Sequence, residues 1–391
     1  MIPPFTFDAP VPIAFGKDRI AKIGRDVQRL AGESAVVVVV SDPFLAEAGL
    51  VARVEAALHS GGHRPACYSE IRSDPLASSV DAVVALARRE KARCLVALGG
   101  GSSMDAGKLA AALAATGDAA ETYALGAKTV PRDGLPKIAV PTTAGTGSEV
   151  TRTSVFSTAD RKLWAWANEL RFDLALLDPG LTVGLPPHLT AATGIDAAVH
   201  AIESATAKRR NPVSAAIALA SVRSLRRWLP RAVAEPDDLE ARGHVQIAAC
   251  MAGIAFDVTG VGAAHAIGHA IGELARVHHG RAVGLALNAT MQDSARAVPE
   301  AYAEVAEALG IDVKGLSTET AAACAAPAFD GWLREIGLRL ALDDHGLSAD
   351  DAPRIAELCF APENKVMLEG DGFSFTRESL ETAIGRMLRA A

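Results

Sequence analysis

Histidines and carboxylates gather in two short windows in the second half of the chain. Asp196 and His200 stand four positions apart in TAATGIDAAVHAIES, so they share one face if this segment is a helix. Glu203 follows in the same window. The second window, GAAHAIGHAIGELARVHHG, holds four histidines: His265, His269, His278 and His279. Isolated histidines are usually core or surface residues, but this density of imidazole and carboxylate predicts a zinc or iron site.

Distance along the chain limits which histidines can share one ion. His265 and His279 are 14 positions apart. In one continuous helix that spacing would separate them by about 21 Å along the axis. We therefore expect the helix to end near Ala275–Val277 and the chain to turn back. Spacing does not decide between His265 and His269, or between His278 and His279.

A glycine-rich turn lies in the first half of the chain, where a strand meets a helix. The aliphatic run Cys94–Leu98 continues into GGGSSMD, and Ser102 is expected to open a helix. Glycines let the backbone approach a ligand, and a helix N-terminus offers unpaired N–H groups and a positive dipole. The turn therefore predicts a pyrophosphate site, although it matches neither standard nucleotide fingerprint. The alternative is a tight turn capped by Ser102.

Two further polar features follow aliphatic runs. Pro141–Glu149 (PTTAGTGSE) offers hydroxyl groups and glycines suited to ribose, amide or phosphate contacts. Asp42 comes directly after Ala35–Val40, where a carboxylate can bind ribose hydroxyls and repel a 2′-phosphate. The alternative for Asp42 is a turn residue before Pro43.

The elements that position these residues change character near the middle of the chain. Short aliphatic runs typical of buried strands alternate with helical patterns at Pro43–Ser60, Ser79–Glu90 and Ser102–Thr116. These runs are Ala35–Val40, Cys94–Leu98, Ile138–Val140 and Leu174–Leu177. The alternation predicts an α/β domain with a parallel sheet, here residues 1–187. After the Pro- and Gly-rich segment 178–190 the pattern is helical, which predicts an all-helical domain over residues 188–391.

Composition excludes several classes of protein. The 391 residues include 39 basic and 46 acidic ones, for a net charge of -7, and no basic block that would indicate nucleic-acid binding. The five cysteines are widely spaced without a C-x-x-C pair, which favours a reducing compartment, here the cytoplasm. No signal peptide is visible. The apolar stretch Gln246–Ile271 contains Asp257 and two histidines, so a buried helical core explains it better than a membrane span.

Together these segments resemble the iron-containing (group III) alcohol dehydrogenase family, which is related to glycerol dehydrogenase and dehydroquinate synthase. The matching segments are FGKDRI, GGGSSMDAGK, PTTAGTGSEVT, DPGLTVGLPPHLTAATGIDAAVHAIES and GAAHAIGHAIGELARVHHG. Beyond Pro299 the match is loose. The resemblance implies an N-terminal dinucleotide-binding α/β domain, a C-terminal helical metal-binding domain and a cleft between them.

The resemblance also implies roles for individual residues. The metal ligands correspond to Asp196, His200, His265 and His279, and His269 corresponds to a neighbouring residue linked to proton movement. The cofactor contacts correspond to Asp42, Gly99, Gly100, Gly101, Ser102, Asp105, Thr142, Thr143, Thr146 and Lys162. An acidic residue at position 42 resembles members that favour NAD over NADP.

The activity implied is reversible hydride transfer between a small alcohol or aldehyde and NAD(P). A divalent ion would act on the substrate oxygen, and His269 would pass the proton outward. Four protein ligands leave room for substrate more easily around Fe²⁺ than around tetrahedral Zn²⁺, so iron is favoured and zinc stays open. A homodimer formed through the N-terminal stretch Phe5–Phe15 is expected.

Alternatives within the same resemblance are a maleylacetate-reductase-like reductase of a keto acid and a dehydroquinate-synthase-like lyase that keeps its NAD. A binding protein without turnover is a third alternative. Two segments depart from the family pattern. Residues 163–168 (LWAWAN) are unusually aromatic, and the C-terminal CFAPENKVMLEGDGFSFTRESL lacks the usual N-P-R stretch. Phe256, Trp164 and Trp166 could line an apolar substrate cleft or belong to the core.

Overall fold

The computed structural model describes residues 4–159 and 161–389, which divide into two compact units. The sheet unit consists of Ala9–Thr143 and Gly147–Gly184. The helical unit consists of the chain from Leu185 onward, Ala144–Thr146 and the described residues up to Asp8.

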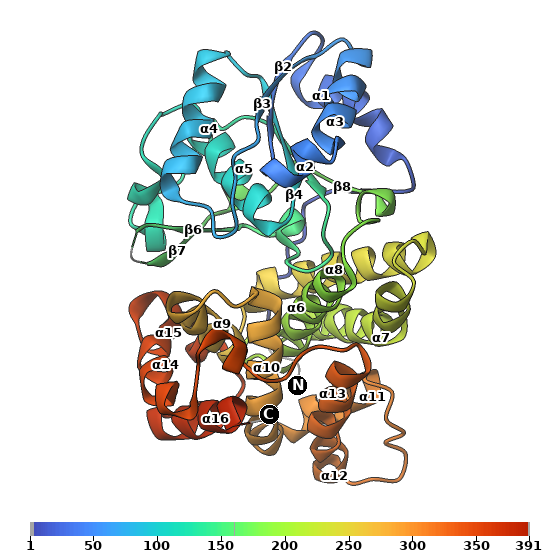
Figure 1. Cartoon of the computed structure of the whole chain (residues 1–391), viewed down its shortest axis with the longest axis vertical. Helices are drawn as coiled ribbons and strands as arrows, with labels where there is room; N and C mark the ends of the chain where they lie inside the picture. Colours follow the sequence, from blue (N-terminus) through green and yellow to red (C-terminus); the bar gives the residue numbers. More distant parts are fainter. Residues whose placement is uncertain (1–3, 160, 390–391) are drawn as a thin grey trace. The chain divides into compact units, whose positions relative to one another are not determined.

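The sheet unit is built on six parallel strands in the order β1-β8-β5-β4-β2-β3 (Figure 1). The strands are β1 (Ile13–Phe15), β2 (Val36–Val40), β3 (Arg64–Tyr68), β4 (Cys94–Gly99), β5 (Lys137–Pro141) and β8 (Leu174–Leu177). A separate antiparallel hairpin consists of β6 (Thr153–Ser157) and β7 (Lys162–Trp166). The predicted parallel α/β sheet is thus confirmed.

Helices cover both faces of this sheet. They are α1 (Ile23–Ala31), α2 (Pro43–Glu47), α3 (Leu50–Ser60), α4 (Ala77–Arg89) and α5 (Gly101–Leu113). Helices α1 and α3 pack on the face that carries Val37 and Val39 of β2, and α4 and α5 lie on the opposite side (Figure 1). The prediction of one helix over Pro43–Ser60 was wrong, because Gly49 adopts a left-handed φ of 77° that ends α2 before α3 begins.

The direction in which successive strands are added to the sheet reverses between β2 and β4. From β2 the chain moves to the edge strand β3, and it then returns to β4 on the other side of β2. Crossovers leave from opposite faces at such a point, so the carboxyl ends of the two strands open a crevice in which ligands bind. Asp42 follows β2 and Gly99 ends β4. The sheet therefore brings two predicted cofactor residues to the same edge.

The helical unit contains the second set of elements. From Leu185 to Arg389 the described residues form helices and loops without a strand, as predicted. The helices are α6 (Pro187–Thr206), α7 (Pro212–Ala234), α8 (Leu239–Thr259), α9 (Ala263–Leu274), α10 (His279–Ala297), α11 (Pro299–Ala308), α12 (Thr318–Ala323), α13 (Ala325–Glu335), α14 (Ala352–Cys359), α15 (Pro362–Gly370) and α16 (Arg377–Arg389).

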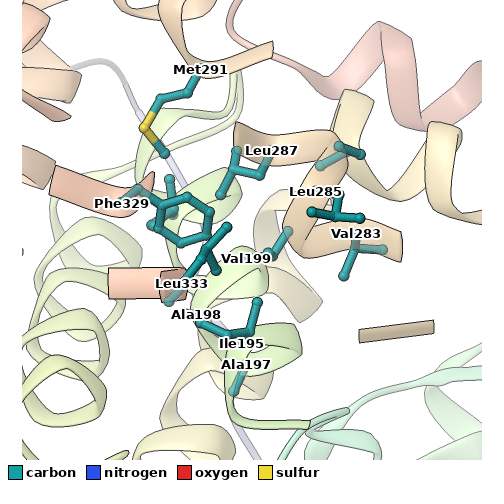
Figure 2. Packing of buried hydrophobic residues seen from close by; sticks show 14 of the residues in the cluster. Ile195, Ala197, Ala198, Val199, Val283, Leu285, Leu287, Met291, Phe329 and Leu333 are labelled. Carbon is teal, nitrogen blue, oxygen red and sulfur yellow. The ribbon is translucent and has the colours of Figure 1, made fainter. Parts of the chain in front are cut away.

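An apolar core joins α6, α10 and α13. Figure 2 shows Val199 of α6, Met291 of α10 and Phe329 of α13 gathered in this core, and all three are fully buried. Glycines let the backbones approach closely. A Cβ on Gly284 of α10 would stand 2.6 Å from Ile195 of α6, which is shorter than any normal contact. Small residues thus set the close packing on which the candidate metal ligands depend.

Among the described helices, no single one is both long enough and apolar enough to cross a membrane. The pair α8 and α9 meets the length and composition criteria only when taken together, across a bend of 100°. All five cysteines are free thiols.

Candidate metal centre and cofactor-binding turns

Three helices bring Asp196, His265 and His279 to one point. The Oδ1 atom of Asp196 on α6 lies 3.8 Å from Nε2 of His265 on α9 and 3.7 Å from Nε2 of His279 on α10. One candidate ligand atom from each residue lies within 4.8 Å of the others. Ligands of one tetrahedral ion with bonds of about 2.1 Å stand about 3.4 Å apart, so the three groups have a spacing suited to a shared ion.

His200, the fourth ligand expected from the resemblance, borders this group of three. Its Nδ1 lies 3.9 Å from Oδ1 of Asp196, and its ring lies 4.3 Å from that of His265. The His200 ring also stacks on Phe256, with centroids 4.3 Å apart. The sequence did not decide whether Phe256 lines a substrate cleft or belongs to the core. In the structure it supports the ring of a candidate ligand.

The hydrogen-bonding state of these atoms fits a metal. Oδ1 of Asp196, Nδ1 of His200 and Nε2 of His265 are buried polar atoms that have no hydrogen-bond partner among the described residues. Such atoms cost free energy unless something binds them. By contrast, the buried His63 of the sheet unit uses both ring nitrogens, on Ala35 N–H (3.2 Å) and the Gly24 carbonyl (2.9 Å). Two of these atoms, on Asp196 and His265, belong to the group of three, and Nδ1 of His200 lies 3.9 Å from Oδ1 of Asp196, so a bound ion would satisfy them.

Glu203 holds His265 from the side opposite the ligand group. Its Oε2 lies 2.6 Å from Nδ1 of His265, so Nδ1 carries a proton toward Glu203, and Nε2 faces Asp196, where a bound ion would take its lone pair. Its Oε1 accepts hydrogen bonds from the backbone N–H groups of Ala264 (2.8 Å) and His265 (3.4 Å) at the start of α9. Asp371 accepts another from Ala263, at 2.9 Å. Glu203 therefore acts as an orienting residue rather than as one of the three grouped ligands.

The charges around the centre favour a cation. Burial lowers the pKa of His265, but the Glu203 and Asp196 carboxylates outweigh it and raise the pKa to about 9. Burial also raises the pKa of Asp196, yet the surrounding imidazoles hold it well below its usual range. For His200 burial prevails and lowers the pKa to about 4, so this ring stays neutral and able to coordinate. The ionised carboxylates of Asp196 and Glu203 thus favour a positive charge at this point, which a divalent ion would supply.

The structure distinguishes the histidines that spacing left open. Helix α9 ends at Leu274 and α10 begins at His279, so the turn lies where it was predicted. His278 is exposed at the start of α10, outside the group of three. His269 is buried one helical turn after His265, and its ring lies 5.5 Å from that of His279. It is therefore a neighbour of the centre.

The glycine-rich turn joins β4 to α5 at the carboxyl edge of the sheet. Gly99 has a φ of 147°, and a Cβ there would stand 2.5 Å from Oγ of Ser103, so no larger residue fits. The helix begins at Gly101, and its N-cap is Gly100, which has no side chain to cap the first N–H groups. Ser102 lies inside the first turn, which departs from the expectation that it opens the helix. The free helix end suits a phosphate group.

Asp42 and the threonines surround this turn. The Asp42 side chain accepts a hydrogen bond from Leu45 N–H (2.9 Å), and its other oxygen is 3.5 Å from the Cβ position of Gly99. Thr142 donates its N–H to the Gly99 carbonyl (3.0 Å), and Thr143 lies 3.4 Å from the Cβ position of Gly100. One oxygen of Asp42 therefore caps α2, as the turn interpretation predicts, and the other faces the glycine turn, so the ribose contact stays a prediction.

The remaining expected cofactor residues differ in their surroundings. Asp105 is bound within the protein, since its Oδ1 accepts from Ser148 Oγ (2.5 Å) and its Oδ2 from Val155 N–H (2.9 Å). Lys162 forms an ion pair with Asp74 at 2.7 Å. Thr146 belongs to the three-residue stretch that groups with the helical unit. Lys108, a fully buried lysine, was not among the residues expected from the sequence, although it ends the GGGSSMDAGK segment and lies three positions after Asp105.

A buried carboxyl in the second turn predicts a pH-dependent stability. Burial raises the pKa of Glu149 from 4.5 to about 7. The folded chain therefore keeps a proton that the unfolded chain releases above about pH 4.5, and stability falls as the pH rises from 4.5 to 7. Glu149→Gln is expected to raise the free energy of unfolding by up to about 3 kcal/mol at pH 8 and to change it little at pH 4.5.

Urea unfolding at both pH values measures this effect. The exposed Glu47→Gln on α2 is the matched control and is expected to show no pH-dependent gain. An equal effect of Glu149→Gln at pH 4.5 and pH 8 would contradict the assignment.

Comparison with known proteins gives a consistent result. Residues 10–179 match the model of the family described as "Iron-containing alcohol dehydrogenase", and residues 190–382 match "Fe-containing alcohol dehydrogenase family, C-terminal". Long-chain-alcohol dehydrogenase 1 of Geobacillus thermodenitrificans is 38% identical over 259 residues, 66% of this chain and 65% of that protein. NAD-dependent methanol dehydrogenase of Bacillus methanolicus is 34% identical over 276 residues, 70% of this chain and 72% of that protein. A crystal structure of 1,3-propanediol oxidoreductase superposes with a TM-score of 0.92 at 33% identity, covering 98% of this chain and 100% of that one.

Proposed function

The chain belongs to the iron-containing alcohol dehydrogenase family, and from this premise we propose that it transfers a hydride reversibly between a small alcohol and NAD with the help of a divalent metal ion. The observation that carries the proposal is the convergence of ligand atoms from Asp196, His265 and His279, with Nδ1 of His200 3.9 Å from Oδ1 of Asp196. In this proposal residues 1–187 are the dinucleotide-binding domain and residues 188–391 the metal-binding and substrate domain.

The residues of the centre have distinct roles in the proposed reaction. Asp196, His200, His265 and His279 would hold the ion, with Fe²⁺ favoured over Zn²⁺. When bound, a divalent ion supplies Lewis acidity toward the oxygen of the alcohol or aldehyde. Glu203 keeps the proton of His265 on Nδ1 and so leaves Nε2 free. His269 would carry the substrate proton outward, since it lies beside His279 and an imidazole titrates near neutral pH.

The cofactor proposal rests on the turns at the carboxyl edge of the sheet. The N–H groups at the start of α5 would bind the pyrophosphate of NAD, and Thr142 and Thr143 offer hydroxyl groups beside it. The free carboxylate oxygen of Asp42 would accept hydrogen bonds from the adenosine ribose. This carboxylate would also repel a 2′-phosphate, and we therefore propose NAD rather than NADP.

Asp42→Ser tests the cofactor preference while keeping a capping oxygen for α2. Removal of the negative charge is expected to raise the ratio of kcat/KM for NADP to kcat/KM for NAD at least about tenfold, equivalent to ~1.4 kcal/mol. Steady-state kinetics with both cofactors give the ratio. Asp238→Ser is the control, because Asp238 is the N-cap of α8 and caps Glu240 and Ala241. An unchanged ratio in Asp42→Ser would remove Asp42 from the ribose site.

Metal removal tests the dehydrogenase itself. A chelator is expected to abolish alcohol-dependent NADH formation, followed at 340 nm, and anaerobic Fe²⁺ or Zn²⁺ is expected to restore it. A panel of short and long primary alcohols and their aldehydes would identify the substrate. Activity that ignores the metal would overturn the metal mechanism. Turnover without net NADH would instead support a lyase that regenerates its NAD.

We also propose a homodimer formed at the edge of the sheet. Strand β1 pairs only with β8 among the described strands, and Ile13 and Phe15 on it are both exposed. An edge strand with exposed apolar side chains is suited to pairing with a second copy. Light scattering would measure the mass in solution.

A further inference from the structure

Lys108 of α5 is the largest charged side chain that is fully buried in the sheet unit, with 0% of its side chain exposed. Its ammonium group donates to the backbone carbonyls of Ser148 (2.7 Å), Thr151 (3.1 Å) and Thr153 (2.8 Å). Oγ1 of Thr151 lies 3.2 Å away, and the Phe172 ring lies 5.5 Å away. Lysine is almost never buried this completely unless its charge is paired, so the site is built around a cation.

The acceptors of Lys108 belong to one segment. Ser148–Thr153 leads from the second polar turn into β6, and β6 pairs with β7, which begins at Lys162. Carbonyl groups that converge on one point repel each other unless a donor lies between them. A neutral side chain at position 108 would remove the ammonium donor from all three buried carbonyls, of which that of Ser148 keeps only the longer bond from Thr151 N–H (3.4 Å) among the backbone contacts outside helices and strands, so the segment would have to move or admit water.

Asp105 completes the arrangement one turn earlier on the same helix. Its carboxylate lies 3.6 Å from Nζ of Lys108, and it accepts hydrogen bonds from Ser148 Oγ and Val155 N–H. We call Asp105 and Lys108 together the α5 clamp. The clamp attaches the β6–β7 hairpin to the helix whose N-terminus forms the glycine turn.

We infer that Lys108 is a positioning residue for dinucleotide binding. The α5 clamp fixes the hairpin that carries Lys162 relative to the glycine turn, so that both can contact one extended dinucleotide. The inference rests on the proposed binding of NAD. A purely structural role would weaken the binding of NADH and ADP alike. The inference instead predicts that only the contacts to the part of NADH beyond the pyrophosphate become weaker. ADP, which would occupy the glycine turn alone, does not depend on the clamp.

Lys108→Met tests this inference through binding of NADH and ADP to the whole chain. NADH fluorescence measures the first dissociation constant, and displacement or calorimetry measures the second. The Kd for NADH is expected to rise at least tenfold, and the Kd for ADP less than threefold. The matched control is Lys137→Met. Lys137 is the other buried lysine among the described residues of the sheet unit, and it begins β5, at the end of that strand away from the polar turn that follows Pro141. This control is expected to change both constants less than threefold.

A second variant separates positioning from stability. Lys108→Met leaves the Asp105 carboxylate buried without its cation, so the double variant with Asp105→Asn is expected to recover thermal stability. The double variant is not expected to recover NADH affinity, because the ammonium donor to the carbonyls of Ser148, Thr151 and Thr153 is still missing.

Three outcomes would overturn the inference. One is an NADH Kd in folded Lys108→Met within twofold of the wild type, and another is an NADH affinity that follows Tm across all three variants. The third is that neither Lys108 variant folds under conditions where Lys137→Met does, which would assign Lys108 to folding alone. Failure of the wild-type chain to bind NADH would instead refute the proposed function.

Discussion

Replacing His265 by alanine is expected to lower kcat/KM for alcohol oxidation by at least about 1000-fold, which corresponds to ~4 kcal/mol of transition-state stabilisation. The variant removes one of the converging donor atoms and leaves Oδ1 of Asp196 with one fewer neighbour. It also removes the partner of Glu203, whose carboxylate is then buried without an imidazole. Metal content after dialysis and competition with a chelator are expected to show binding weakened more than 100-fold, beyond the 10–100-fold typical of an orienting residue.

The controls for this prediction form a graded series. Glu203→Gln keeps the shape of the orienting side chain but not its charge, so metal affinity is expected to fall about 10–100-fold. His63→Gln alters a buried histidine whose nitrogens are both satisfied by backbone groups of the sheet unit. It is expected to reduce stability but to leave metal content unchanged. Equal metal loss in His63→Gln and His265→Ala would show that the effect is unfolding.

The contrast between His63 and His265 shows which features of the site could be predicted from the sequence and which could not. Both are buried histidines, and the local sequence shows only that His265 belongs to a dense window. The difference lies in hydrogen bonding, because His63 meets a donor and an acceptor of distant backbone segments whereas Nε2 of His265 meets none. That distinction depends on tertiary contacts. The break before His279 could still be predicted from the sequence. One continuous helix would hold His265 and His279 too far apart to share an ion, so a turn had to separate α9 from α10.

The sheet unit shows the same limits. Aliphatic runs such as Val36–Val40 and Leu174–Leu177 were predictable, because strands buried on both faces need continuous apolar residues. The edge strands β1 and β3 and the β6–β7 hairpin were not, because their exposed or partly buried positions interrupt any such run. The role of Lys108 was also not visible, because its acceptors are backbone carbonyls about 40 positions away. A backbone carbonyl leaves no signature in the sequence.

Gly280→Ala is expected to cause the second large effect, although no metal-binding atom changes. A Cβ at this position, the second residue of α10, would lie 2.0 Å from the Ala192 carbonyl oxygen of α6 and 3.2 Å from Cβ of Asp196. A backbone oxygen cannot rotate away as a side chain can, so α10 must shift from α6. Such overpacking typically costs about 1–3 kcal/mol and here, against backbone, is expected to reach the upper end or more.

The shift would also separate the ligands that the two helices bring together. His279 precedes Gly280 directly, and its Nε2 lies 3.7 Å from Oδ1 of Asp196. A displacement of about 1 Å exceeds the tolerance of metal–ligand bonds, so metal affinity is expected to fall at least tenfold. Gly272→Ala in α9 is the control, because a Cβ there meets nothing within 4 Å and alanine favours a helix over glycine by about 1 kcal/mol. Thermal unfolding and metal titration of both variants distinguish the outcomes. If Gly280→Ala binds metal as tightly as Gly272→Ala, the close contact between α6 and α10 does not set the geometry of the centre.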